Sequence, residues 1–436
     1  MTLRNSKYRI VAVAIGLMLF AFCVRAVGIS YPAQTVFDEG VSVMMASEIV
    51  KHQGIFDIHP PLTHLLDAAF LAPHELPQEN LGHFGADYGD FPYERLRMIR
   101  VVLGTLLVGV IFGIAYMLYK RLSLAIIPAF LVAIDPALIV YSRLILPDMV
   151  LLFFGFTGIL LFLFSRSAQQ KKYSLFIILL IIFAAVCFGL ALSVKWTALG
   201  FLLIPAYYLV RDRKWSFAVL GISMVAVTYI TVFHIFFANI TSSTLLPITT
   251  EDKIVVDSRP LPQSRTIFST AAYLPTYTKN MKNSNSQFQE NNAASMPFGW
   301  PLGEGSIQML RTGENKGIML VANNFSWSMA LAVLVILLCG FFVWRKLHDH
   351  LYAVTGVLIA SLFLNYLPFF VIGRTFYLYH YFTALIFGFL LIPAGIVLFK
   401  HYLPHGNSKK YSPVVLAFLF IALIFSLAVL HRTYGV

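Results

Sequence analysis

Apolar residues lie in long uninterrupted runs along this chain, and this pattern predicts a series of membrane-spanning helices. An α-helix needs roughly 20 apolar residues to cross about 30 Å of hydrocarbon. Runs close to this length lie at about 10–31, 99–119, 123–141, 149–165, 174–192, 196–210, 216–238, 327–344, 351–372, 376–399 and 411–431. The pattern therefore predicts an all-α, polytopic integral membrane protein with about eleven crossings.

Basic residues lie in every second connection between these runs, and this alternation predicts the orientation. They are Arg4, Lys7 and Arg9; Lys120 and Arg121; Arg166, Lys171 and Lys172; Arg211, Arg213 and Lys214; Arg345 and Lys346; and Lys400, Lys409 and Lys410. Because cytoplasmic loops carry an excess of Lys and Arg, we expect a cytoplasmic N-terminus and a C-terminal tail on the opposite side. We expect no cleavable signal peptide, because the first run is long and contains Arg25.

Two longer segments interrupt the runs, at residues 32–98 and 239–326, and both face away from the cytoplasm in this orientation. The second is rich in Asn, Ser, Thr and Pro and reads as a loop with little regular core. The expected organisation is an N-terminal membrane module (1–238, including loop 32–98), a large extracytoplasmic loop (239–326) and C-terminal membrane helices (327–436). We expect a multi-pass protein of the plasma membrane whose functional residues lie on the extracytoplasmic side.

Composition and charge exclude other classes of protein. The chain is 58% hydrophobic and 12% charged, whereas soluble domains are about 25% charged. The net charge of +12 is explained by the basic loops, so we expect no nucleic-acid partner. The three cysteines lie within apolar runs and indicate no disulfide framework. The sequence contains neither a Gly-rich phosphate loop beside a strand nor an HExxH motif.

The sequence TVFDEG places Asp38 and Glu39 directly after the first run, just outside the predicted hydrocarbon. Partial desolvation can raise the basicity of a carboxylate there, which suits a general base. The alternative is that Asp38 caps an interfacial helix beginning at the following residues.

The sequence FDIHPPL follows in the same loop and contains Asp57 and His59. Two prolines restrict the backbone, so this turn is expected to present both side chains to a ligand. Alternatively, the prolines mark a stop between two interfacial helices.

Cations near the predicted outer helix ends form a complementary set: Arg95, Arg97, Arg100, Arg143, Lys195 and Arg374. Ionisable residues at membrane depth are costly and usually face a cavity or a partner, so a converging set would hold a phosphate. Three alternatives are open. Lys195 could extend to the headgroups, Arg143 could pair with Asp148, and an aromatic belt could explain Tyr379.

Motifs in order along the chain resemble those of the protein O-mannosyltransferase family, integral-membrane glycosyltransferases of the glycosyltransferase C superfamily. They are FDEG (37–40), FDIHPPLTHLL (56–66), YERLRMIRVVLG (93–104), SRLILPDMVLLFF (142–154), GLALSVKWTALG (189–200), MPFGWPL (296–302) and NYLPFFVIGRTFYLYHYFTAL (365–385). The segment 239–326 is too short for the MIR domain of eukaryotic members, which indicates a prokaryotic-type member.

The resemblance implies inverting transfer of mannose, or of another hexose, from a polyprenyl-phosphate donor such as polyprenyl-phosphate mannose to Ser/Thr hydroxyls of translocated proteins. Asp38 would be the general base, and Glu39 would orient the acceptor or Asp38. Candidates for binding the donor phosphate are Arg97, Arg100, Lys195 and Arg374. Candidates for binding the sugar or the acceptor are Asp57, His59, Arg143, Asp148, Trp300, Tyr379 and His380. Trp300 is expected over the cavity as a wall, with interfacial anchoring as its alternative.

No cofactor is expected beyond the lipid-linked donor, because an activated donor does not require a divalent metal. Asp38, Glu39, Asp57 and His59 could nevertheless supply metal ligands. The expected partners are the polyprenyl-phosphate sugar, an acceptor protein or peptide near the translocon, and membrane lipid.

Two alternative functions are open. The first is transfer within the same superfamily to a lipid or glycan acceptor, as in aminoarabinose transferases that modify lipid A. The second is transport of a lipid-linked sugar. Transporters often show an internal repeat and midplane polar groups. Here no repeat is visible and the polar groups cluster at the outer boundary, which favours the transferase.

Overall fold

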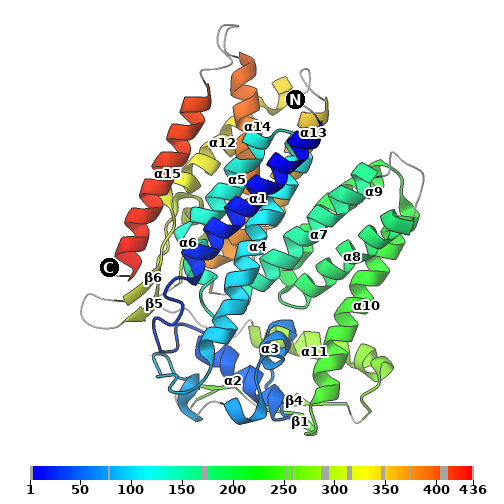
Figure 1. Ribbon diagram of the computed structural model, residues 1–436. Helices are drawn as coiled ribbons and strands as arrows, with labels where there is room; N and C mark the ends of the chain where they lie inside the picture. The colour runs from blue at the N-terminus through cyan, green and yellow to red at the C-terminus, as the bar shows by residue number, and fades with distance from the viewer. Residues whose placement is uncertain are drawn as a thin grey trace.

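The computed structural model describes most of the chain, with gaps. The described residues are 3–76, 79–168, 175–246, 248–250, 253–256, 259–262, 264–285, 294–311, 317–344, 349–372, 375–402 and 411–434. Two layers are visible: a layer of long, roughly parallel helices, and below it in Figure 1 a layer of short helices and strands.

Apolar helices form the first layer and account for every run predicted from the sequence. They are α1 (Leu3–Ala26), α4 (Tyr93–Tyr119), α5 (Leu122–Ile134), α6 (Pro136–Tyr141), α7 (Asp148–Ala168), α8 (Leu175–Leu192), α9 (Leu203–Arg211), α10 (Trp215–Asn239), α12 (Asn324–Trp344), α13 (Asp349–Leu364), α14 (Phe382–Tyr402) and α15 (Tyr411–Tyr434). The 3₁₀ helices η3 (Trp196–Leu202), η5 (Leu367–Phe370) and η6 (Leu378–Tyr381) lie at their ends.

Seven helices among the described residues are long and apolar enough to cross a membrane. Shorter apolar helices at Leu122–Ile134, Trp196–Arg211, Asn324–Gly340 and Val415–His431 occupy the four remaining predicted runs. The all-α membrane architecture is therefore confirmed, while the number of eleven crossings stays a prediction. The two chain ends lie at opposite ends of the helical layer (Figure 1).

The predicted run 123–141 is divided into two helices at Asp135. Pro136 has no N–H group and disfavours helical backbone in the residue before it. Asp135 is accordingly extended (φ −62°, ψ 120°), and its carboxylate accepts a 3.1 Å hydrogen bond from the N–H of Leu138. Asp135 thus ends α5 and caps α6.

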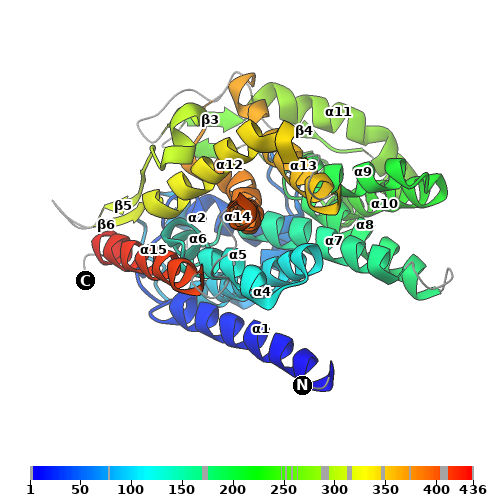
Figure 2. The same cartoon turned by 90° about the horizontal axis from the view of Figure 1, so that it is seen from above.

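The main apolar core lies where α4, α5, α7 and α14 pack together. Seen from above, α14 lies near the centre of the bundle and α1 lies at its edge (Figure 2). Phe387 and Leu390 of α14 are fully buried, whereas α1 is mostly exposed and packs on α4 and α5. An exposed apolar helix at the edge is expected for a surface that contacts lipid.

The two predicted loops have regular structure and form the second layer. The first contains α2 (Glu39–Val50), α3 (Leu62–Ala68), η1 (Pro73–Glu75) and η2 (Glu79–Gly82). The second contains β1 (Thr244–Leu245), β2 (Ile248–Thr250), β3 (Lys253–Val256), β4 (Arg259–Pro260), α11 (Ile267–Asn285), η4 (Pro297–Leu302), β5 (Ile307–Arg311) and β6 (Gly317–Leu320). Its strands form three antiparallel pairs, β1–β4, β2–β3 and β5–β6.

The two segments share a core of their own, which the sequence did not indicate. The N–H of Phe56 donates to the carbonyl of Leu246 (3.1 Å), and the rings of Phe56 and Tyr277 pack edge to face, 5.2 Å apart. Phe233 and Phe237 of α10 pack against the same Tyr277. The second segment is therefore a partly folded layer rather than a plain loop.

Candidate active site

Asp38 lies at the start of α2, at the junction of the two layers. The preceding Phe37 has a left-handed backbone (φ 53°), which is uncommon for a residue with a side chain. Its N–H donates to the carbonyl of Met309 in β5 (3.0 Å), and its ring meets the rings of Tyr377 and Tyr379 edge to face. These contacts fix the turn that presents Asp38.

The Asp38 carboxylate is available for chemistry. It occupies the N-cap position of α2 but makes no capping hydrogen bond, so the capping alternative does not explain its side chain. The side chain is exposed to solvent, although protein surrounds it closely enough that desolvation raises its pKa to about 6. The charge of Lys195 lowers this pKa, and those of Asp57 and Asp148 raise it. A carboxylate with a raised pKa is suited to accept a proton.

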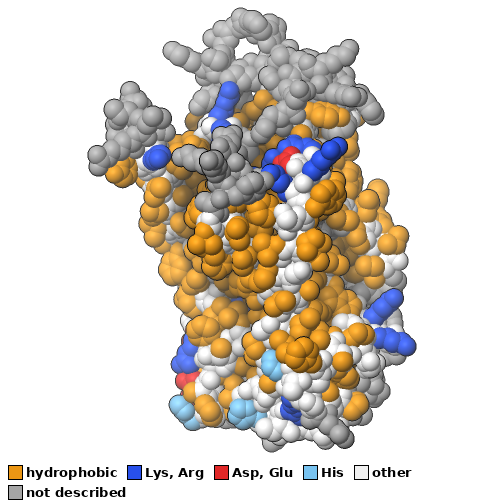
Figure 3. Space-filling view, turned by 90° about the vertical axis from the view of Figure 1, so that its right-hand side faces the viewer, with side chains coloured by type: hydrophobic (Ala, Val, Ile, Leu, Met, Phe, Trp, Pro, Cys, Tyr) orange, Lys and Arg blue, Asp and Glu red, His pale blue; other side chains and the backbone are white. Residues whose placement is uncertain are grey.

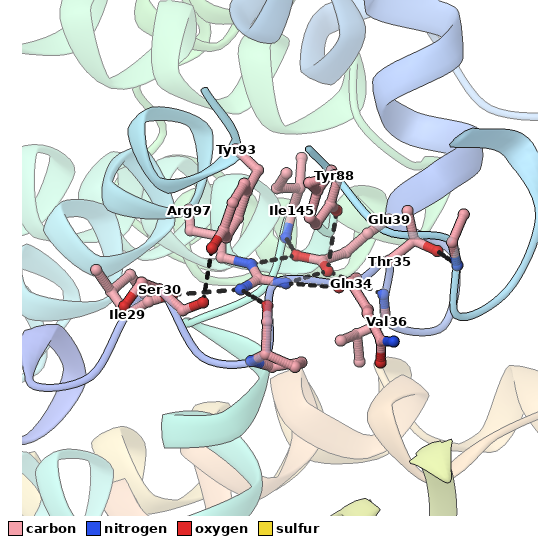
Figure 4. A network of polar contacts seen from close by, with 12 residues as sticks. Ile29, Ser30, Gln34, Thr35, Val36, Glu39, Tyr88, Tyr93, Arg97 and Ile145 are labelled. Atoms are coloured by element: carbon pink, nitrogen blue, oxygen red, sulfur yellow. Dashed lines mark hydrogen bonds and ion pairs between the residues drawn. The ribbon is translucent and has the colours of Figure 1, made fainter. Parts of the chain in front are cut away.

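Glu39 is fully buried and anchors the same turn (Figure 4). Its Oε1 accepts from the N–H of Ile145 (2.8 Å), and its Oε2 accepts from the N–H of Val36 (3.0 Å) and the hydroxyl of Tyr88 (3.2 Å). No acceptor can reach a carboxylate enclosed in this way. Of the two predicted roles for Glu39, the geometry supports the orientation of Asp38.

Arg97 completes the network around Glu39, which differs from its predicted contact with the donor phosphate. Its Nε and Nη2 donate to the two carboxylate oxygens of Glu39 (2.9 and 2.7 Å), and further bonds reach the carbonyls of Pro32 (2.7 Å) and Gln34 (3.1 Å). The side chain is 0% exposed. The guanidinium is thus used by the fold, because a buried charge needs a partner.

Arg100 also differs from its predicted contact with the donor phosphate. Its guanidinium pairs with both carboxylate oxygens of Asp67 on α3, and both side chains are 0% exposed. It also donates to the carbonyl of Leu146 (3.2 Å). Neither Arg97 nor Arg100 lines the cavity that opens beside Lys195, so we assign both arginines a structural role.

Arg143 does not pair with Asp148 among the described contacts. It donates to the carbonyls of Arg25 (2.9 Å), Val27 (2.6 Å) and Gly28 (2.7 Å), which follow or end α1. The last carbonyls of a helix have no partner within the helix, and a guanidinium can satisfy several of them. These hydrogen bonds explain the position of Arg143 without any contact with a sugar or an acceptor.

Lys195 instead pairs with Asp148. Its Nζ lies 2.9 and 2.7 Å from the two carboxylate oxygens, and the hydroxyl of Tyr141 donates to the same carboxylate (2.7 Å). The ammonium also lies over the ring of Tyr379, 5.1 Å from its centroid. Because Lys195 is buried and paired, it does not extend toward headgroups as the alternative supposed.

A cavity of about 340 Å³ opens beside Lys195. His59, Lys195 and His380 are among the polar residues that line it, and most of the remaining wall is apolar, with side chains from η3, α13 and η5. Such a cavity, with a cation in its wall, fits an amphipathic ligand that has a charged head and an apolar body. The predictions for Lys195, His59 and His380 thus converge on one place.

Asp57 has a partner that the sequence analysis missed. Its carboxylate lies 2.9 Å from Nε2 of His64. Burial raises the pKa of Asp57, but the hydrogen bond from His64 and the charges of His59 and His64 outweigh burial and lower the pKa below its ordinary value. His64 lies in the quoted FDIHPPLTHLL motif, and its place in the first turn of α3 is the signal that could have indicated it.

Trp300 is not a wall of the cavity. It is 0% exposed, its Nε1 donates to the hydroxyl of Ser295 (2.9 Å), and its ring packs on Phe369 and His380. Burial also argues against the interfacial alternative. Trp300 therefore lies behind two residues that do line the cavity, and supports them.

Tyr379 and His380 stack on each other, with ring centroids 4.5 Å apart. Both rings line a small recess that Asp148 and Lys195 also border. Their predicted contact with the sugar or the acceptor stays a prediction. Arg374 lies outside the described residues, so its predicted role stays a prediction. Among the described residues, no group of three or more His, Cys, Asp and Glu is arranged to hold a metal ion.

Comparison with known proteins agrees with this architecture. The family described as dolichyl-phosphate-mannose-protein mannosyltransferase matches residues 15–254, more than half of the chain. The C-terminal four-transmembrane region of protein O-mannosyltransferases matches residues 274–436. The two matches together cover both helical halves and most of the segment between them.

Curated relatives match over shorter segments. Dolichyl-phosphate-mannose–protein mannosyltransferase 1 of Schizosaccharomyces pombe is 29% identical over 246 residues, which are 51% of this chain and 27% of that protein. Mannosyltransferase 4 of Saccharomyces cerevisiae is 32% identical over 138 residues, which are 31% of this chain and 18% of that protein. The chain thus matches less than a third of the length of these relatives.

Solved structures share the fold. The Saccharomyces cerevisiae protein O-mannosyltransferase Pmt1-Pmt2 complex bound to the sugar donor superposes with a TM-score of 0.83 at 14% identity, over 98% of this chain and 90% of that chain. An Archaeoglobus fulgidus oligosaccharyltransferase gives 0.53 at 14% identity, over 98% and 56% of the two chains. The predicted glycosyltransferase C fold is confirmed. The chain belongs to the dolichyl-phosphate-mannose–protein mannosyltransferase family.

Proposed function

We propose that this chain transfers mannose from polyprenyl-phosphate mannose to Ser or Thr hydroxyl groups of proteins, on the extracytoplasmic side of the plasma membrane. One observation carries the proposal. An exposed carboxylate with a raised pKa, Asp38, lies within electrostatic reach of Lys195, and Lys195 lines a largely apolar cavity. The family match and the names of the relatives support the choice of sugar and acceptor.

The reaction would proceed in a single displacement. The Asp38 carboxylate takes the proton of the acceptor hydroxyl, and the oxygen attacks the anomeric carbon of mannose. The bond from that carbon to the phosphate oxygen breaks, and its electron pair leaves on the polyprenyl phosphate. Attack and departure on opposite faces invert the anomeric configuration.

Lys195 is our candidate for binding the phosphate, because among the described residues it places a cation in the cavity wall. Its ammonium would stabilise the charge that develops on the leaving phosphate. The carboxylate of Asp148, which also accepts from the hydroxyl of Tyr141, would hold Lys195 in place before the donor arrives. The phosphate would then share the ammonium with Asp148, using a donor direction that the ion pair leaves open, since an ammonium has three N–H groups.

The acceptor would approach from the layer formed by the two extracytoplasmic segments, where Asp38 is exposed. His59 lines the cavity, and Asp57 lies near enough to influence the charge of Asp38. Both are candidates for contacting the sugar or the acceptor. We also propose the predicted division into a catalytic module (1–238), an extracytoplasmic segment (239–326) and a C-terminal helical unit (327–436), with the N-terminus in the cytoplasm.

Transfer of radiolabelled mannose tests the proposal directly. The purified protein in nanodiscs would receive undecaprenyl-phosphate mannose and a peptide rich in Ser and Thr. Asp38→Asn should lose transfer, whereas Asp90→Asn, an exposed aspartate of the same loop, should retain it. Transfer should also survive EDTA, because the leaving phosphate needs only fixed cations.

Three results would contradict the proposal. Retained transfer in Asp38→Asn would exclude Asp38 as the base. Donor binding without transfer to the peptide would indicate a lipid or glycan acceptor. Donor movement across the membrane without any transfer would indicate a transporter.

A further inference from the structure

The first extracytoplasmic segment contains several histidines: His52, His59, His64, His74 and His83. Histidine side chains are visible at the lower end of the molecule, below its hydrophobic middle (Figure 3). His52, His74 and His83 are exposed, and His59 lines the cavity beside Lys195. The side chain of His64 is only 12% exposed. His64 is therefore the largely buried histidine of this segment to which the proposed function gives no role.

The His64 side chain has one polar partner among the described residues, the carboxylate of Asp57. Its Nε2 lies 2.9 Å from Oδ2 of Asp57, and Nε2 is the donor because a carboxylate only accepts. Its Nδ1 is buried and meets no hydrogen-bond partner in the described part of the chain. A leucine would fill this position without the cost of a buried, unpaired nitrogen. What a histidine adds here is the bond to Asp57.

This bond closes a turn that forms part of the cavity wall. Residues 58–60 lie within the turn and line the cavity beside Lys195. Just after the turn, the N–H of Leu62 donates to the carbonyl of Ser193 (3.0 Å), two residues before Lys195. The bond from His64 thus orients the Asp57 carboxylate in a segment that is anchored next to the cation.

The Asp57 carboxylate is one of the charges that act on Asp38. Desolvation is the main cause of the raised pKa of Asp38; the charge of Lys195 lowers this pKa, and the charges of Asp57 and Asp148 raise it. Lys195 and Asp148 form an ion pair, so their effects on Asp38 partly cancel. The charge of Asp57 is left to make Asp38 a stronger base.

His64 maintains the charge on Asp57. Burial raises the pKa of Asp57, and the hydrogen bond from His64 is the largest cause that lowers it, followed by the charges of His59 and His64. Tyr277 of α11 also faces Asp57, but burial raises the pKa of Tyr277 above its ordinary value, so this side chain is neutral. Loss of the bond from His64 would therefore let burial favour the protonated form of Asp57.

We propose that His64 is a positioning residue for transfer, which holds the Asp57 carboxylate oriented and charged within electrostatic reach of Asp38. This inference rests on the proposed function for the role of Asp38 as the base. His64 itself touches neither donor nor acceptor in this proposal. It acts on the reaction through Asp57, and Asp57 acts through its charge on Asp38.

The pH dependence of transfer tests the inference. The measured quantity is the ratio of kcat/KM at pH 5 to kcat/KM at pH 8, with undecaprenyl-phosphate mannose and the peptide rich in Ser and Thr. Asp57→Asn removes the charge, and His64→Leu lets Asp57 take up a proton as the pH falls. Both variants should raise the ratio about two- to fivefold, because Asp38 then ionises at lower pH.

Two further variants separate this role from a merely structural one. His64→Gln keeps an N–H donor and should restore the ratio to within about 1.5-fold of wild type. His83→Leu replaces an exposed histidine of the same segment and should leave the ratio unchanged. The double variant Asp57→Asn/His64→Leu should have the ratio of Asp57→Asn alone, because His64 acts through Asp57.

A structural role would lower kcat/KM equally at both pH values. An unchanged ratio in His64→Leu, the same ratio in His64→Gln as in His64→Leu, or a further rise in the double variant would therefore overturn the inference.

Infrared titration of the carboxyl groups decides the inference without any transfer. If the wild-type protein transfers no mannose, or transfers it at a rate that does not depend on pH, the proposed function fails; if only a variant is inactive, the proposed function stands. In either case the absorption of the protonated carboxyl group that is missing from Asp38→Asn is followed against pH. It should disappear at lower pH in His64→Leu than in wild type, and disappearance at the same pH in both proteins overturns the inference.

Discussion

Replacing Arg97 by Met distinguishes a guanidinium that supports the fold from one that binds the donor phosphate. Arg97 is 0% exposed and donates to both oxygens of Glu39, which is also 0% exposed. Methionine is similar in length and fills the same space without a charge. Arg97→Met therefore leaves a carboxylate that keeps its bonds from Val36, Ile145 and Tyr88 but loses the cation paired with it.

The expected cost follows from the burial of the pair. Removing one partner of a buried ion pair destabilises a protein by about 3–5 kcal/mol. Arg97→Lys keeps the charge but cannot reproduce the planar fork, so we expect a loss of about 1–3 kcal/mol. In the double variant Arg97→Met/Glu39→Gln the buried charge is absent, and part of the stability lost in Arg97→Met should return.

Two measurements on the same proteins test this reasoning. Unfolding in detergent should show the order of stability wild type, Arg97→Lys, then Arg97→Met. The Kd for undecaprenyl-phosphate mannose should stay within about twofold for the folded protein, because Arg97 does not line the cavity beside Lys195. A tenfold weaker Kd with unchanged stability would refute the structural role and restore the role predicted from the sequence.

Transfer should rise with pH to a plateau, with its midpoint near the Asp38 pKa of about 6, and a flat profile from pH 5 to 8 would exclude Asp38 as the base. Between the ordinary Asp38 pKa of 3.8 and its folded-state pKa of about 6, folded Asp38 binds more protons than unfolded Asp38. Ionisation of Asp38 therefore lowers the stability of the folded protein as pH rises. Asp38→Asn should raise the Tm at pH 7, and a lower Tm would contradict this. Lys195→Met should raise the donor Kd tenfold or more, the value of a charge-assisted hydrogen bond, and adding Asp148→Asn should recover stability but not affinity. Arg100→Met should cost about 3–5 kcal/mol, because Asp67 would be left buried and unpaired; a loss under 1 kcal/mol would show that the pair is dispensable.

The membrane helices could be predicted from the sequence because the bilayer imposes one length and one composition on every crossing. Helix boundaries are harder to predict where an apolar run contains a residue that disfavours helical backbone. At Asp135 the conflict between the run and the proline after it ends one helix and starts another. The order in the segment 239–326 was missed, because its short strands and α11 gain their core from α10 and from the first loop rather than from their own periodicity.

Only some residues of the candidate site could be predicted from the sequence, and their pairings could not. Asp38, His59, Lys195 and His380 were indicated because isolated polar residues next to apolar runs need a reason to be there. The sequence did not indicate which residues pair with one another, because Glu39 and Arg97 are 58 positions apart and Asp148 and Lys195 are 47 positions apart. No local pattern encodes a contact between such distant segments, and the nearest charged neighbour in the sequence was the wrong partner for Asp148.

The ion pairs at the junction of the layers support the proposal that Asp38 is the base. Three carboxylates at the junction of the layers have a matched cation: Glu39 with Arg97, Asp67 with Arg100, and Asp148 with Lys195. Asp38 stands among them without a capping bond, exposed to solvent and with a raised pKa. A fold that pairs these three carboxylates with cations would be more stable with Asp38 paired as well. Retaining an ionisable group at a cost in stability is typical of a functional site. The cost itself is therefore an argument that Asp38 accepts the proton. Lys195, which lines the cavity, is the cation among the described residues that we propose is shared with a phosphate.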